Sequence, residues 1–504
     1  MPRSREGYRH DPKNGLSTGF ETDAVVSPPS NVGGRTKFDT IVIGAGYAGL
    51  IAARDLVIAG QSVLLVEARD RLGGRTWTAK EGKDLFEMDM SFTFSLSCAF
   101  AWSELVKYGL DTELIYTPNA DFPEQAKCVV RYNDETWQMA PEQLNQVLDS
   151  AWTKFCNVDG VDARSVVAIP GQIAHGSFID PKILAIYDKM TVAERLAECR
   201  ERKILTDLEY KCFVPWVTRK FGSQPEKSGM MDLFRYYRMA NGSCSFLGGV
   251  TAGYRLRDGQ SVWARAIFHD ALDKQKLSYS FDTAVKEIND SGRSVKVVTT
   301  QGSFEASKII CTVPLNVTKN IKFSPPLSPA RKEAFDVGSI AFAHKIHCVM
   351  SDPSLRSKAF SAYDTREAVG MASAVGVDYT HDKKSSVIVC FGSDSTDPEK
   401  HASKHPELIN QWLGRLDPSL KDVHQRSVWH EWTEDEWLKG GWSMFSPNFY
   451  TKYWPELVKP HGNVEFASAD YPEHGWKGFI DGAISEGARA ARQVIKKAPR
   501  PARL

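Results

Sequence analysis

The sequence predicts an α/β fold with more than one packed core. The chain has 504 residues, of which 42% are hydrophobic and 25% are charged, a globular composition long enough for two or three cores. Between residues 38 and 67, an apolar strand pattern is followed by a glycine-rich segment, a helical pattern and a second strand. This alternation predicts parallel strands with a helix packed against them.

A glycine-rich turn joins the first predicted strand, residues 38–43, to the helix. Its glycines, Gly44, Gly46 and Gly49, have the spacing G-x-G-x-x-G. Gly44 allows a tight turn, Gly46 lets the backbone approach a pyrophosphate, and Gly49 lets the helix lie close to the sheet. The helix N-terminus, where Ala48 lies, offers N–H groups to phosphate. The segment therefore predicts a dinucleotide site.

An acidic residue follows at the distance that such a site requires. Glu67 ends the second predicted strand, residues 62–66, and lies 21 residues beyond Gly46 (67 − 46). Its carboxylate can accept both hydroxyls of an adenosine ribose. Nicotinamide enzymes do not need the segment that comes next. That segment is Ala68-Arg69-Asp70-Arg71-Leu72-Gly73-Gly74-Arg75, in which the glycines expose backbone and Arg75 adds a cation near the phosphates.

Composition excludes several other classes of function. Lysine and arginine total 63 against 62 acidic residues, so no global field draws the chain to nucleic acid or to an anionic membrane. Nine scattered cysteines without a C-x-x-C pair argue against a disulfide framework or a metal site. No secretory signal and no apolar stretch long enough for a membrane span are found. Residues 1–37 are predicted to form an extended or partly disordered arm.

Later motifs complete the pattern of a known family. Over residues 38–495 the ordered set resembles the flavin amine oxidase superfamily, most closely the fungal monoamine oxidases. The resemblance implies that the backbone of Val285 contacts adenine and that Asp470, Phe479 and Ile480 bind the flavin. The motifs are Arg71-Leu-Gly-Gly-Arg75, Asp258-Gly-Gln-Ser261, Cys311-Thr-Val-Pro314, Phe466-Ala-Ser-Ala-Asp470 and Gly478-Phe479-Ile480-Asp-Gly-Ala483.

The same resemblance implies a two-domain flavoprotein of α/β (α+β) class. A Rossmann-type FAD-binding domain would be interleaved with a substrate domain of mixed sheet and helices. The FAD-binding domain would comprise residues 38–98, 248–318 and 428–495, and the substrate domain residues 99–247 and 319–427. Residues 496–504 would form an exposed basic tail.

Three residues are candidates for the chemistry. Lys345 lies in a predicted strand, residues 340–350, on the face of small alanines. By spacing alone this is a sheet-edge or a cavity position, but the family's flavin-facing lysine, which holds a water against flavin N5, lies in this strand. Trp442 and Phe479 match the two aromatics that flank the amine in monoamine oxidases, although aromatics beside glycine are also common in ordinary cores. Gly441 stands where covalent family members carry a cysteine, so non-covalent FAD is expected, with Cys98 as a distant alternative.

The wall predicted beside the flavin departs from the family. Residues 89–98 read Asp-Met-Ser-Phe-Thr-Phe-Ser-Leu-Ser-Cys where fungal monoamine oxidases usually begin Gly-Gly-Thr-Trp. The change is either neutral drift or a pocket reshaped for a bulkier substrate. The leading hypothesis is an FAD-dependent amine oxidase that transfers hydride to flavin N5 and reduces O₂ to H₂O₂. The alternatives are a related oxidocyclase or dehydrogenase acting on a bulky indole alkaloid, and a flavin-binding scaffold without turnover. An L-amino-acid oxidase would need a carboxylate-binding arginine that the sequence does not identify.

The last residues suggest a location. The chain ends Ala-Arg-Leu504, which resembles the Ser-Lys-Leu peroxisomal address. Peroxisomal import, through its receptor, would place an H₂O₂-producing oxidase where the peroxide is destroyed; the cytoplasm is the alternative. The expected partners are therefore a small amine or indole alkaloid, O₂ and the import receptor, with a homo-oligomer left open.

Overall fold

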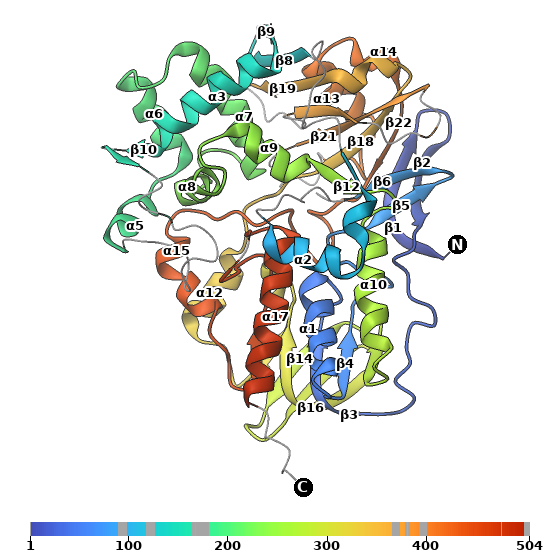
Figure 1. The fold of residues 1–504 in the computed structure, drawn as a ribbon. Helices are drawn as coiled ribbons and strands as arrows, with labels where there is room; N and C mark the ends of the chain where they lie inside the picture. The colour runs from blue at the N-terminus through green and yellow to red at the C-terminus, as the bar shows by residue number, and fades with distance from the viewer. Residues whose placement is uncertain are drawn as a thin grey trace.

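Two sheets with their covering helices make up the structure, one above the other in Figure 1. The computed structural model describes residues 2–88, 98–116, 127–158, 160–162, 167, 181–364, 373–377, 381, 384–392, 401–474 and 476–497. This is the mixed α/β, two-domain type of fold that the sequence predicts.

The smaller sheet has eight strands, and its central strands run parallel. Its strand β4 is buried along its whole length, as expected for a parallel strand covered on both faces. In sheet order the strands are β13 (Leu277–Ser280), β4 (Val63–Val66), β3 (Lys37–Ile43), β16 (Gly302–Cys311), β15 (Val295–Thr299), β14 (Val285–Asp290) and β17 (Lys322–Ser324), with β23 (Val464–Phe466) paired to β16.

Register brings the ends of three strands to one edge of this sheet. Ile43 pairs with Val66 on one side and with Cys311 on the other. The turns that follow these residues therefore begin side by side at the carboxyl edge, where ligands of open α/β sheets bind.

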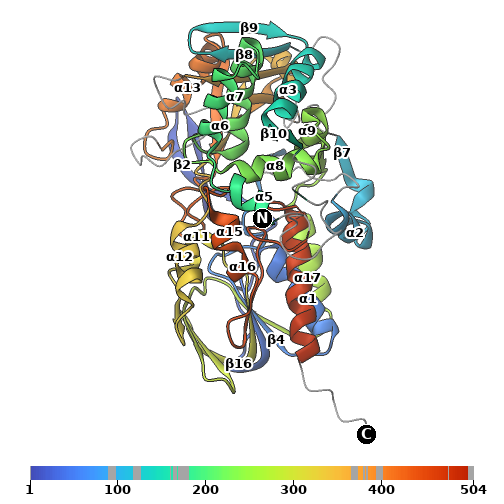
Figure 2. The same ribbon diagram turned by 90° about the vertical axis from the view of Figure 1, so that its left-hand side faces the viewer.

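Two helices from opposite ends of the chain pack together over this sheet, as both views show (Figures 1 and 2). They are α1 (Tyr47–Ile58) and α17 (Ile480–Lys497). A Cβ atom placed on Gly487 would lie 2.2 Å from the carbonyl oxygen of Ala48, so only glycine allows this approach. Beside them in Figure 1 lies α10 (Ser261–Leu272), and α11 (Leu315–Thr318) follows β16.

The larger sheet has eleven strands and mixed pairing. In sheet order they are β6 (Asp84–Glu87), β5 (Thr78–Glu81), β2 (Gly15–Glu21), β1 (Arg3–Asp11), β22 (His424–Trp429), β18 (Lys345–Met350), β21 (Ser386–Phe391), β20 (Ser373–Val377), β19 (Lys358–Tyr363), β8 (Lys127–Tyr132) and β9 (Glu135–Met139).

Helices gather beside the larger sheet in the upper part of Figure 1. They include α3 (Pro141–Cys156), α5 (Pro181–Tyr187), α6 (Val192–Glu201), α7 (Asp207–Phe221), α8 (Met230–Met239), α9 (Cys244–Ala252) and α13 (Leu408–Leu416). Elsewhere lie α2 (Ala99–Lys107), α12 (Pro329–Val337), α14 (Leu420–Val423), α15 (Phe449–Lys452), α16 (Trp454–Leu457), the short strand pairs β7 (Leu114–Tyr116) with β12 (Tyr254–Leu256) and β10 (Asn157–Val158) with β11 (Val161–Asp162), and two 3₁₀ turns, η1 (Leu110–Glu113) and η2 (Pro353–Ser357).

The N-terminal segment differs from the loose arm that its polar composition predicts. Residues 3–21 form the hairpin β1–β2, which enters the larger sheet by pairing Tyr8 with Trp429 and Glu21 with Lys80. Composition misleads here because the strand that β1 joins lies hundreds of residues away in sequence, so its contribution is invisible locally.

The predicted domain boundaries stay predictions. Strands β5 and β6, from the segment assigned to the FAD-binding domain, form the edge of the larger sheet. The predicted tail begins too early, because α17 continues through Lys496 and Lys497, whose ammonium group pairs with Glu465 at 2.6 Å. Residues 498–504 lie outside the described part. Within that part no helix is long and apolar enough to cross a membrane.

Candidate functional site

The glycine-rich turn has the geometry that its sequence predicts. Gly44 lies at φ +102°, a conformation that L side chains rarely adopt. A Cβ atom on Gly49 would lie 1.8 Å from the carbonyl oxygen of Gly44, so the first turn of α1 closes on β3 only with glycine there. Thr312, at the end of β16, adds a hydrogen bond from its hydroxyl to the carbonyl oxygen of Ile43 at 2.7 Å.

The N-terminus of α1 is open to an anion. Gly46 occupies the N-cap position, and no side chain caps the helix. The nearest atom to a Cβ placed on Gly46 is the Cα of Gly74, 3.9 Å away, so the described residues leave the space in front of the helix open. Unpaired N–H groups and the positive end of the helix dipole therefore face room for a pyrophosphate.

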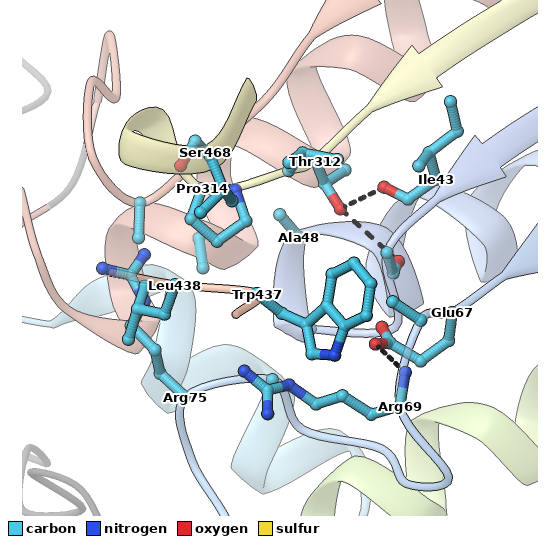
Figure 3. A pocket seen from close by; sticks show the side chains of 18 of the residues that line it. Ile43, Ala48, Glu67, Arg69, Arg75, Thr312, Pro314, Trp437, Leu438 and Ser468 are labelled. Carbon is cyan, nitrogen blue, oxygen red and sulfur yellow. Dashed lines mark hydrogen bonds between the residues drawn. The ribbon is translucent and has the colours of Figure 1, made fainter. Parts of the chain in front are cut away.

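Glu67 is fixed by backbone groups at the neighbouring strand end. Its carboxylate accepts the N–H of Ala45 at 2.6 Å. It also accepts the N–H of Arg69 at 2.9 Å, the contact drawn in Figure 3. Burial raises the pKa of this carboxyl, and the two N–H groups and nearby arginines oppose the rise. A carboxylate has about four acceptor positions, so these contacts leave capacity for ribose hydroxyls.

These elements line a cavity of about 210 Å³ along the sheet edge. The predicted cofactor residues in its wall are Gly44, Gly46, Ala48, Glu67, Ala68, Arg69, Gly74, Arg75, Val285, Phe479 and Ile480. Thr312, Pro314 and Ser468, which belong to the later sequence motifs, lie in the same wall, and the structure adds Trp437 and Leu438, which the sequence did not single out (Figure 3). An open glycine cradle, a helix N-terminus and a buried acid in one cavity fit the phosphates and ribose of FAD.

Two predicted residues support this cavity from behind. Gly49 packs under the turn, and Asp470 is not among the described residues that line the cavity. Asp470 accepts a hydrogen bond from Arg75 at 2.7 Å and another from the N–H of Leu315 at 3.0 Å. The early and late motifs, 395 residues apart, are thus joined by an ion pair.

The N-terminal hairpin reaches the same site through Glu6. Its carboxylate pairs with Arg69, and with Arg71 at 2.6 Å, while Arg69 also pairs with Asp435 at 2.7 Å. Burial alone would raise the pKa of Glu6, but the two guanidinium groups outweigh it and lower the pKa from 4.5 to about 2. Arg71 is fully buried and donates to the carbonyl oxygen of Gly74, so Glu6 supplies charge that holds the glycine pair in place.

Replacing Glu6 with glutamine should weaken both the fold and the binding of FAD. The change leaves the buried Arg71 without its carboxylate and should lower the free energy of unfolding by about 2 kcal/mol, less than a fully buried pair costs because Arg69 keeps Asp435. Chemical denaturation and titration with FAD measure the two effects. Since folding lowers the pKa of Glu6, the contribution of its carboxylate to the free energy of unfolding is complete above about pH 4.5. It is lost as the pH falls towards 2.

A matched control lies on the same hairpin. Arg5 forms ion pairs with Asp70 and Asp282, but its side chain is 76% exposed. Arg5→Gln should therefore change stability and FAD affinity much less. Equal effects from the two variants would show that Glu6 has no special role in the site.

A second cavity, of about 220 Å³, meets the first at three shared residues: Trp442, Gly478 and Phe479. Its walls come from β8, α3, α7, α8, α9 and the strands β19–β21, and are largely apolar and aromatic. The two predicted aromatics thus lie in the wall that the two cavities share.

Both aromatics are held in position by neighbours. The indole N–H of Trp442 donates to the carbonyl oxygen of Lys220 at 3.0 Å. Phe479 is 8% exposed and makes edge contacts with Trp476 and Tyr236, at ring-centre distances of 5.7 and 6.3 Å. Such packing fixes the ring planes, which is what orienting a small substrate requires.

Lys345 is buried, but its setting differs from the prediction. Strand β18 begins at Lys345, and residues 340–344 are not in the strand, because Ile340 and Ala341 hydrogen-bond with Met444 and Gly441 instead. Alternation with the alanines therefore does not hold. The Lys345 ammonium donates to the carbonyl oxygen of Glu87 at 2.7 Å, and the residue is not among the described residues lining either cavity.

The structure describes only part of the predicted wall beside the flavin, residues 89–98. Residues 89–97, the altered wall, lie outside the described part, while Cys98 is buried just before α2. Among the described residues none of the cysteines forms a disulfide. Sequence reasoning missed two cationic residues in the second cavity, Arg219 and Lys220, because nothing in the local pattern of α7 distinguishes them from ordinary basic residues in a last helical turn.

Comparison with known proteins agrees with this geometry. At 26% identity the chain resembles pseudooxynicotine dehydrogenase of a Pseudomonas species, covering 91% of this chain and 86% of that protein. It resembles human flavin-containing amine oxidase B at 22% identity, over 91% and 86% of the two chains. Among solved structures, putrescine oxidase bound to putrescine has a TM-score of 0.71 at 20% identity, over 92% and 99% of the chains. Cyclohexylamine oxidase from Brevibacterium oxydans has a TM-score of 0.69 at 21% identity, over 91% and 99%.

The family follows from a match along most of the chain. Residues 47–495 match the family model described as flavin containing amine oxidoreductase. The predicted superfamily, the α/β two-domain fold, the FAD cofactor and the assignment as an oxidoreductase are thereby confirmed. The chain belongs to the flavin-containing amine oxidoreductase family.

Proposed function

We propose that this enzyme oxidises the C–N bond of an amine held between Trp442 and Phe479. The observation that carries the proposal is the junction of the two cavities at these residues. Relatives named for nicotine-type substrates, and a fold shared with putrescine and cyclohexylamine oxidases, support the same class of substrate. The test is anaerobic mixing with amines, which should bleach the flavin.

The proposed reaction balances as amine, O₂ and water giving carbonyl product, ammonia or a smaller amine, and H₂O₂. FAD, when bound, supplies the electron sink, taking a hydride from the α-carbon at N5 and passing two electrons to O₂. The chain's own residues exclude water and orient the substrate: the cavity walls desolvate the amine, and the two ring faces align it. Hydrolysis of the iminium product then releases the carbonyl compound.

Lys345 is proposed to hold a water beside the reacting centre, as the family resemblance suggests. Its burial and its hydrogen bond to Glu87 support a fixed ammonium rather than a mobile surface lysine. Lys345→Met should keep FAD but slow flavin reduction or reoxidation by about tenfold or more, roughly 1.4 kcal/mol of activation free energy. Stopped-flow absorbance measures both half-reactions. The control is Lys439→Met, which removes an ammonium bonded to the exposed carbonyl of Glu434. Unchanged rates of both half-reactions in Lys345→Met would mean that Lys345 has only a structural role.

Finer assignments remain part of the proposal. A particular affinity to fungal monoamine oxidases is a prediction, since the relatives described above are bacterial and mammalian. The alternative of oxidative ring closure on an indole alkaloid rests on residues 89–98, of which 89–97 lie outside the described part, so no described contact favours it. Product mass separates the two reactions: amine oxidation loses ammonia or amine, whereas ring closure loses two hydrogens.

Peroxisomal location is also proposed, on the Ala-Arg-Leu ending alone. That ending lies beyond the described residues and follows the basic end of α17. A fluorescent protein carrying residues 490–504 at its C-terminus should show a punctate signal that disappears when Leu504 is deleted. A diffuse signal from the intact tail would favour the cytoplasm.

A further inference from the structure

Two cations, Arg219 and Lys220, line the second cavity, and none of its described lining residues is acidic. Arg219 and Lys220 both line it from the last turn of α7. Neither side chain forms a hydrogen bond or an ion pair among the described residues, and the ammonium of Lys220 lies 5.7 Å from the centre of the Trp216 ring. The negative end of the helix dipole compensates part of the charge, but it gives the five N–H donors of a guanidinium nothing to bond to.

The rest of the cavity does not supply the missing charge. The described residues that line it include no aspartate or glutamate. The carboxylate of Asp149, on α3, is already engaged, because it accepts the N–H of Cys244 on α9. Burial and the adjacent Arg219 lower the pKa of Lys220 to about 7, and burial lowers the pKa of Arg219. Both directions are those that partial removal from water gives a cation, and both side chains are half-buried at the cavity wall.

We propose that Arg219 and Lys220 form an anion-binding subsite, so that the substrate is an amine that also carries a carboxylate on an apolar or aromatic body. The proposal rests on the function proposed above and narrows its substrate class. A bound carboxylate supplies the acceptor that the guanidinium fork matches. The carbonyl oxygen of Lys220 bonds to Trp442, so the subsite belongs to the wall that orients the reacting amine.

The charge of the cavity also excludes a class of substrate. A diamine such as the putrescine bound in one structurally similar oxidase carries a second ammonium. In this cavity that ammonium would meet two cations and no described acid, so like charges would oppose its entry. The carboxylate of a carboxylated amine would instead be attracted to the same two cations.

The decisive experiment compares two probes that differ in charge. Indole-3-acetate and indole-3-acetamide are titrated into the oxidised holoenzyme, and binding is read from the change in the flavin absorbance spectrum. The acetate should bind about ten- to a hundredfold more tightly than the amide, the range expected for hydrogen bonds to a charged group. Arg219→Gln and Lys220→Met should each reduce this preference, and together should abolish it.

Controls separate the subsite from the fold and from the proposed function. Lys211→Met removes a cation on the same helix that pairs with Glu135 and Asp207 outside the cavity, and should keep the preference. Arg219→Lys keeps the positive charge, and this variant should retain part of the preference for the acetate. Equal binding of the two probes to the unaltered enzyme, or a preference unchanged in Arg219→Gln and Lys220→Met, overturns the subsite.

Reduction of the flavin by two substrates tests the subsite independently of the binding titration. Tryptophan should bleach the flavin at lower concentration than tryptamine, and Arg219→Gln should reverse that order. If tryptamine bleaches the flavin but tryptophan has no advantage, the amine oxidase function stands and the subsite fails. If neither compound nor any other amine bleaches it, the function fails, and the probe titration still decides the subsite.

Discussion

A Gly46→Val variant should fold but bind FAD at least about a hundredfold more weakly, a loss of about 2.7 kcal/mol or more. The space in front of Gly46 is open, with the nearest described atom 3.9 Å from a Cβ placed there, so valine disturbs no close neighbour. It would instead fill the room that the pyrophosphate needs at the N-terminus of α1. FAD content per chain and fluorescence titration with FAD measure the loss.

Two further variants show whether the effect is local. Gly249→Val places the same side chain in α9, where no described atom lies within 4 Å of the new Cβ, and should keep FAD. Gly49→Ala should impair folding itself rather than FAD binding alone, because the new Cβ would clash with the carbonyl oxygen of Gly44. A yellow Gly46→Val protein with full FAD content would contradict the site.

Acid precipitation of the unaltered protein should release the flavin into the supernatant. The family resemblance aligns Gly441 with the cysteine of covalent members, and glycine has no side chain that could bond to the cofactor. The absorbance of the supernatant and of the redissolved pellet measures the partition. Colour retained in the precipitate would point to another attachment residue.

Trp442→Ala should lower kcat/KM for amines by about a hundredfold, roughly 2.7 kcal/mol of transition-state stabilisation. The residue stands where the two cavities meet, so its removal merges them, admits water and frees the substrate to rotate. FAD should stay bound, because Glu67, Arg75 and the α1 N-terminus are untouched. Steady-state kinetics and flavin content, measured on the same preparation, separate the two effects.

Trp442→Phe is the matched control because it keeps an aromatic face and loses the hydrogen bond to Lys220. It should retain most of the activity if the ring face orients the amine. Activity lost equally in the phenylalanine and alanine variants would mean that the hydrogen bond, and not the face, carries the effect. Activity unchanged in both would remove Trp442 from the substrate site.

The dinucleotide site could be predicted from the sequence because its parts are local. A strand, a glycine turn and a helix lie within a few residues of one another, and each glycine has a steric reason that the structure confirms at Gly44 and Gly49. The late motif could be assigned by resemblance, and the ion pair between Arg75 and Asp470 joins it to the early motif.

What the sequence could not predict depends on contacts between distant segments. Glu6 reaches Arg69 and Arg71 only because the N-terminal hairpin pairs with β22, more than 400 residues away in the chain. The strand predicted over residues 340–350 is right for Lys345–Met350 and wrong for 340–344, because residues of that segment bond to a loop that periodicity cannot detect. The arginine that an acidic substrate would need is present in the sequence, but only the assembled cavity separates Arg219 from the chain's other arginines.

The proposed function requires that FAD bound in this chain accept electrons from an amine at the junction marked by Trp442 and Phe479. The most direct measurement is anaerobic titration of the purified yellow protein with a panel of aromatic amines, amino acids and indole alkaloids, followed by admission of O₂. At least one amine should bleach the flavin, and O₂ should restore the colour with one H₂O₂ formed per amine consumed. A flavin that dithionite reduces but no amine in the panel bleaches would contradict the proposal.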